Sequence, residues 1–171
     1  IMINLHLVTK KEVFPIVLIL ILALSRLIPH PPNFTPIISV AILSSFFFRN
    51  INLAIIVLLI SMLISDFLIG FHKYIFFTYI PLVIITLTFK DKILKYKNML
   101  FYSFIGVIIF YLISNFGVWI LDKNYEKNIY GLINCYIAAL PFLKNSIIST
   151  IFYTYLTFST YNFSKKLIFK S

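Results

Sequence analysis

Long apolar runs separated by short polar segments dominate the pattern of this chain. A transmembrane helix needs roughly 17–25 mostly apolar residues, and most of the runs come near this length. The alternating pattern of a membrane barrel is not seen. We therefore predict an all-α integral membrane protein, a six-transmembrane-helix bundle with helices at about 13–28, 37–48, 51–69, 75–89, 99–121 and 146–163.

Composition supports the same class of protein. The chain is 61% hydrophobic and 12% charged, with a mean hydropathy of +0.99, whereas soluble domains are roughly 25% charged. Its net charge of +10 comes from cations that flank apolar runs, which is typical of membrane topology and does not indicate nucleic-acid binding. We expect a single transmembrane domain over residues 1–171.

A polar, proline-rich segment, Arg26 to Pro36, interrupts the first two apolar runs. Four of the seven prolines of the chain lie in it, and each proline lacks a backbone N–H and disfavours helix at the residue before it. The segment therefore ends the first helix and starts a stiff loop. This loop is either a plain connector or a lid over a ligand.

The segment 131–145 is apolar enough to be a seventh span, and charge distribution argues against this. With six spans, ten lysines and arginines lie on one side and four on the other, whereas a span at 131–145 reduces the split to about eight against six. Since cytoplasmic loops are rich in these residues, both termini are expected in the cytoplasm. Residues 131–145, broken by Pro141, then form a re-entrant or interfacial segment on the outer side.

Two charges fall inside apolar runs at similar depth. Arg26 lies about one turn from the outer end of the first predicted helix, and Asp66 lies about one turn from that of the third. An isolated charge in the membrane costs roughly 2.5–3.5 kcal/mol, so each needs a partner. We predict a structural ion pair between them, with direct ligand binding as the alternative.

Further polar side chains gather at the same outer end. Asn115 and Trp119 are four residues apart and share one helix face, which could hold a ligand, although such residues also serve as helix contacts and interfacial anchors. The predicted substrate-binding residues are His30, Asn33, Thr35, Asn115, Trp119, Tyr136 and Asn145.

No residue pattern indicates catalysis, a cofactor or a metal. His30 and His72 lack cysteine or carboxylate partners at ligand spacing, and Cys135 is expected to be a packed, inert thiol. Only four glycines are present, and no phosphate-binding loop is among them. The chain is therefore not expected to be an enzyme, and in particular not an ATPase.

Three motifs in order, SRLIPHPPNFTPI, SNFGVWI and GLINCYIAALPFLKN, resemble a small family of bacterial membrane proteins classed by name only as transport proteins. That family in turn resembles the substrate-binding S components of energy-coupling-factor (ECF) transporters. The resemblance covers about residues 24–157 and implies an outward pocket for a vitamin-like micronutrient, capped by a lid that here corresponds to His30–Pro36. Many S components dock through an alanine-xxx-alanine pattern, whereas Ala23 has Ile19 and Leu27 at those positions.

The expected function is therefore that of a substrate-binding subunit for uptake of a small water-soluble micronutrient across the bacterial cytoplasmic (inner) membrane. It would work with an energising membrane and ATPase module, alone, or with another partner. The alternative is a non-transport scaffold or assembly protein with the same six-helix form. A pocket of about 300 Å³ or more at the outer end would favour the first function.

Overall fold

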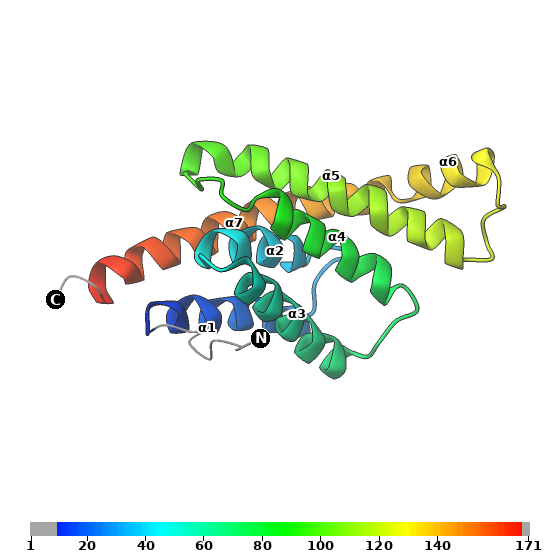
Figure 1. The fold of residues 1–171 in the computed structure, drawn as a ribbon. Helices are drawn as coiled ribbons and strands as arrows, with labels where there is room; N and C mark the ends of the chain where they lie inside the picture. Colours follow the sequence, from blue (N-terminus) through cyan, green and yellow to red (C-terminus); the bar gives the residue numbers. More distant parts are fainter. Residues whose placement is uncertain (1–9, 169–171) are drawn as a thin grey trace, which may run out of the picture.

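The structure is a computed structural model that describes residues 10–168, with the side chains of residues 12–165. Within this range the chain is all-α (Figure 1). Its helices are α1 (Lys10–Leu24), α2 (Ile37–Phe47), α3 (Ile51–Ile69), α4 (Ile75–Thr88), α5 (Tyr96–Leu121), α6 (Ile129–Ala138) and α7 (Leu140–Ile168), and a short 3-10 turn, Ser25–Leu27, follows α1.

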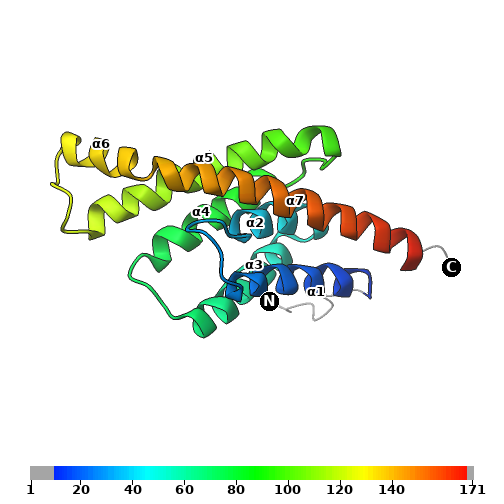
Figure 2. The ribbon, with the colours of Figure 1, turned by 180° about the vertical axis from the view of Figure 1, so that it is seen from behind.

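The short helix α2 forms the centre of the bundle. Every residue of this helix except Phe46 is buried, and α1, α3, α4, α5 and α7 all contact it. Figures 1 and 2 show it enclosed by these helices. A helix that is apolar all round is stable when protein surrounds it. The short length of α2 is therefore explained by its place in the core, because a helix surrounded by protein need not reach both membrane surfaces.

The helices run back and forth along the bundle. The first turn of α1 and the last turns of α7 lie at the same end, together with the α2–α3 turn and the α4–α5 loop (Figures 1 and 2). The α3–α4 and α5–α6 loops lie at the opposite end. The proline-rich segment also joins its helices on that side.

Length and apolar composition mark the chain as a membrane protein. Two helices, α3 with 19 residues and α5 with 26, are each long and apolar enough to cross a membrane. The pair α6 and α7, bent by 47° at the break between them, forms a third candidate if it is one span. Helices α2 and α4 are apolar but shorter. The six-span count and the orientation of the chain stay predictions.

Several predicted boundaries differ from the structure. The first helix begins at Lys10 instead of residue 13, α5 begins at Tyr96 instead of residue 99, and the last helix ends at Ile168 instead of residue 163. Two further differences have a clear cause in proline. The first helix ends at Leu24 instead of residue 28, because Ile28 precedes Pro29 and adopts an extended backbone, with φ −75° and ψ 132°. The last helix begins at Leu140 instead of residue 146. Pro141 stands in its first turn, where its missing N–H is tolerated, and it prevents a continuous helix from α6 because it cannot donate to the carbonyl of Ile137. The segment 131–145 is thus helical on both sides of one break.

Candidate functional site

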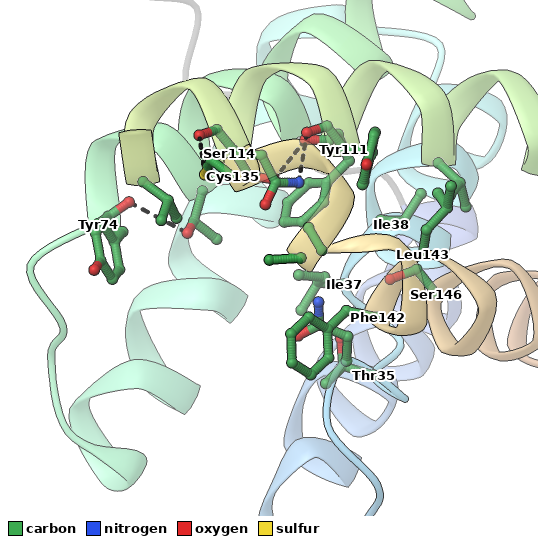
Figure 3. A pocket seen from close by; sticks show the side chains of 18 of the residues that line it. Thr35, Ile37, Ile38, Tyr74, Tyr111, Ser114, Cys135, Phe142, Leu143 and Ser146 are labelled. Atoms are coloured by element: carbon green, nitrogen blue, oxygen red, sulfur yellow. Dashed lines mark hydrogen bonds between the residues drawn. The ribbon is translucent and has the colours of Figure 1, made fainter. Parts of the chain in front are cut away.

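A cavity of about 420 Å³ lies at the end of the bundle that carries the α3–α4 and α5–α6 loops. Its walls come from the proline-rich segment and from α2, α4, α5, α6 and α7, and Figure 3 shows their side chains arranged around one space. Its apolar lining includes Ile37, Ile38, Phe110, Phe142 and Leu143. Its polar lining comprises Arg26, Asn33, Thr35, His72, Tyr74, Thr78, Tyr111, Ser114, Asn115, Tyr125, Cys135 and Ser146.

The proline-rich segment is held against α7 by hydrogen bonds to its backbone. Asn145 Nδ2 donates to the carbonyl of Pro32 at 2.9 Å, and Ser149 Oγ donates to that of Asn33 at 3.5 Å. Asn33 has a φ of 59°, a left-handed conformation that asparagine tolerates better than most residues. Asn33 and Thr35 line the cavity. His30 is exposed, with its ring beside the Pro31 carbonyl, and is not among the lining residues.

The charges of Arg26 and Asp66 meet beside the cavity. Arg26 Nη1 lies 2.6 Å from Asp66 Oδ1 and 2.6 Å from Ser65 Oγ. The other carboxylate oxygen accepts a bond from the Tyr79 hydroxyl at 2.7 Å. The Asp66 side chain is 1% exposed, and that of Arg26 is 11% exposed and lines the cavity. Arg26 is thus ion-paired on one side and open to the cavity on the other, and its direct contact with a ligand stays a prediction.

Asn115 and Trp119 separate into two different environments. Asn115 lines the cavity and donates from Nδ2 to the Tyr111 carbonyl at 2.8 Å, and its amide oxygen accepts no bond from residues 12–165. Trp119 lies beyond the cavity lining. Its indole N–H donates to the Glu126 carbonyl at 2.9 Å, and Lys127 Nζ bonds to the Trp119 carbonyl. In this structure Trp119 therefore fixes the α5–α6 loop.

Tyr136 also bonds to backbone and stands outside the cavity lining. Its hydroxyl donates to the Leu112 carbonyl at 2.6 Å, and the Tyr111 hydroxyl donates to the Tyr136 carbonyl at 2.5 Å. The two rings pack edge to face, with centroids 5.5 Å apart. These reciprocal bonds hold α6 on α5, so they position the Cys135 side of α6 as one wall of the cavity.

Tyr74 connects the α3–α4 loop to the end of α5. Its hydroxyl donates to Asp122 Oδ2 at 2.7 Å, and Lys73 Nζ lies 3.5 Å from the same oxygen. The bond from Tyr74 lowers the pKa of Asp122 below its ordinary value. Because Tyr74 lines the cavity, this contact closes one side of it.

Sequence reasoning missed the tyrosines and hydroxyls of the cavity, above all Tyr111 and Ser114. The signal was present, because Tyr111, Ser114, Asn115 and Val118 recur at the spacing of one helix face. The prediction took Asn115 with Trp119 from this helix, whereas the residues of α5 that line the cavity are Val107, Phe110, Tyr111, Ser114, Asn115 and Val118.

Metal-binding residues are not gathered in the part of the chain that the structure describes: no three His, Cys, Asp or Glu side chains lie together there. Cys135 is buried, and its thiol contacts the Asn115 carbonyl at 3.5 Å. The lining offers hydrogen bonds and aromatic surfaces to a ligand.

Within the described residues the fold is all-helical, with two or three helices long and apolar enough to span a membrane, and a space of small-molecule size at one end is lined by apolar and polar side chains. The chain belongs to the family described as "Family of unknown function (DUF6580)", whose model matches residues 7–170. No curated protein and no solved structure matches it. The resemblance to S components of ECF transporters stays a prediction.

Proposed function

We propose that the chain captures a small molecule in the cavity between α4, α5, α6 and α7 and serves as the substrate-binding subunit of a membrane uptake system. The observation that carries the proposal is the cavity volume of about 420 Å³, which exceeds the roughly 300 Å³ at which ligand sites begin. A scaffold protein has no need for a space of this size lined by both aromatic and hydrogen-bonding side chains, so the cavity favours uptake over assembly.

The lining favours a mostly uncharged ligand that contains a ring. Tyr111, Phe110 and Phe142 offer aromatic surfaces, and the Asn115 amide and Ser114 hydroxyl offer hydrogen bonds. The charge of Arg26 is already matched by Asp66. The guanidinium nitrogens other than Nη1 make no bond within residues 12–165, so they are available to a carbonyl oxygen of the ligand.

Energy for uptake has to come from another source. The sequence contains no glycine-rich phosphate-binding loop, so an ATPase module in a partner complex would supply it. The substrate would be a vitamin-like micronutrient, as the resemblance implies, and the chain itself would perform no chemical conversion.

Purification from bacterial membranes, followed by mass spectrometry of the extracted small molecules, tests the proposal. We expect one compound to be retained in amounts near one per chain. The variant Asn115→Ala removes a lining amide, and Asn98→Ala is the matched control because Asn98 lies in the same helix at the far end from the cavity.

Loss of one ligand hydrogen bond costs about 1 kcal/mol, so Asn115→Ala should reduce retention roughly fivefold, whereas Asn98→Ala should retain the compound as the wild type does. Two results contradict the proposal. One is a folded wild-type protein that carries no compound and gains no thermal stability from any member of a micronutrient panel. The other is equal retention by both variants, which would place the ligand outside this cavity.

A further inference from the structure

A second, smaller pocket lies at the opposite end of the fold. Its volume is about 160 Å³, and it forms where the α2–α3 turn meets the α4–α5 loop. Three cations line it, Arg49 from the turn and Lys90 and Lys92 from the loop, together with the carboxylate of Asp91. We propose that this pocket binds the phosphate of an acidic phospholipid headgroup.

The side chains of the pocket cations have no anionic partner within residues 12–165. Arg49, Lys90, Lys92 and Asp91 are all exposed, and none of their side chains makes a hydrogen bond or ion pair with another residue in that range. Three positive charges against one negative charge leave an excess that a phosphate group can neutralise. Phosphate accepts charge-assisted hydrogen bonds from arginine and lysine.

Backbone geometry brings these charges to the same place. Asn50 caps α3, with its side chain accepting from Asn52 N–H at 2.9 Å, so Arg49 stands directly before a helix N-terminus, where the partial charge is positive. Across the pocket, the amide of Lys92 donates to the Phe89 carbonyl at 3.1 Å, and Asp91 adopts a left-handed φ of 63°. This tight turn keeps both lysines at the pocket.

The apolar part of the lining identifies the source of the phosphate as a lipid. Phe46, Phe48 and Ile51 line the same pocket, and Phe46 stacks with Tyr102 at 5.6 Å between ring centroids. Apolar helices α2 and α4 end here and α3 begins here. Cations next to aromatic residues at the ends of membrane helices lie at headgroup depth, and basic pockets between such helices bind anionic headgroups.

Native mass spectrometry of the full chain in detergent tests the proposal, with phosphatidylglycerol, phosphatidylcholine or inorganic phosphate added separately. Each cation near a membrane surface contributes about fivefold to binding of an anionic lipid. The variant Arg49→Gln/Lys92→Gln should therefore bind phosphatidylglycerol roughly 25-fold more weakly. The control Lys123→Gln/Lys144→Gln removes the same charge from exposed positions outside the pocket and should bind within twofold of wild type.

A third variant reverses the sign of the effect. Asp91→Asn removes the only carboxylate of the pocket and keeps a residue that tolerates the left-handed backbone, so it should bind phosphatidylglycerol about fivefold more tightly. Its binding is measurable even if Arg49→Gln/Lys92→Gln does not fold.

Three outcomes overturn the proposal: equal binding of phosphatidylglycerol and phosphatidylcholine, equal weakening in the control, or displacement of the lipid by millimolar inorganic phosphate. The proposal does not depend on the function of the cavity. Loss of lipid binding with the small molecule retained, and the reverse, are separate results.

Discussion

Replacement of Asp66 by leucine removes the centre of the buried charge cluster. The side chain is 1% exposed and bonds to Arg26 at 2.6 Å and to the Tyr79 hydroxyl at 2.7 Å. Asp66→Leu therefore leaves a guanidinium and a hydroxyl without their acceptor. Loss of one partner of a buried ion pair costs about 3–5 kcal/mol, and an unsatisfied hydroxyl costs about 1–3 kcal/mol. Because Arg26 lines the cavity and can turn toward it, we expect a total loss near 4 kcal/mol.

Equilibrium unfolding in mixed micelles, with increasing sodium dodecyl sulfate, measures this loss. The double variant Arg26→Met/Asp66→Leu removes both charges and should be more stable than Asp66→Leu alone by about 2 kcal/mol, because no buried charge remains unpaired. Lys73→Gln is the control, since its ion pair with Asp122 is 3.5 Å long and the Lys73 side chain is 57% exposed, and its unfolding should change little. Strictly additive effects of the two single substitutions would refute the reasoning.

The remaining predictions concern helix packing and pH. Gly117→Ala places a Cβ against the ring of Phe77, so it should lower the unfolding free energy by about 1–3 kcal/mol. In Gly106→Ala the new Cβ lies 3.1 Å from a terminal methyl of Ile42, so this variant should lose less unfolding free energy in the same assay. Equal losses in the two variants would contradict the packing argument. The pKa of Asp122 is lowered from 3.8 by the Tyr74 hydroxyl, so this contact stabilises the fold above about pH 4 and the stabilisation is lost as the pH falls through the folded-state value. The rate of hydrogen exchange in the α3–α4 loop should rise over that acidic range in the wild type and should not rise there in Tyr74→Phe. The same rise in Tyr74→Phe would exclude the Tyr74–Asp122 contact as the cause.

Helix positions were predictable where sharp polar signals bound an apolar run. The third run was predicted at 51–69 and α3 spans the same residues, because Asn50 caps one end and Gly70, with a φ of 109°, ends the other. The start of α7 was not predictable in this way. Pro141 breaks a helix in its interior but is tolerated in the first turn, and only the fold shows which of these positions it occupies.

Which of the predicted site residues line the cavity depends on the hydrogen-bond partners that each polar side chain finds in the fold. Asn33, Thr35 and Asn115 line the cavity, and whether they bind a ligand stays a prediction. The side chains of Trp119, Tyr136 and Asn145 instead donate hydrogen bonds to backbone carbonyls of neighbouring segments. These half-buried side chains take backbone acceptors close to them, and those acceptors are set by loops whose course the sequence does not specify.

The break at Ala139 separates two helices that share one neighbour. The ten residues of α6 contact α5, to which Tyr111 and Tyr136 bond them, whereas α7 contacts α5, α2 and the proline-rich segment. At 1.5 Å per residue, α6 is a lever about 15 Å long, and a rotation of about 10° at its base moves its far end by roughly 2.6 Å. That displacement is close to the diameter of a water molecule. The residues of α6 that line the cavity, Cys135 and Ala138, lie next to this break, so the same rotation would move the cavity wall far less than it moves the far end of the helix.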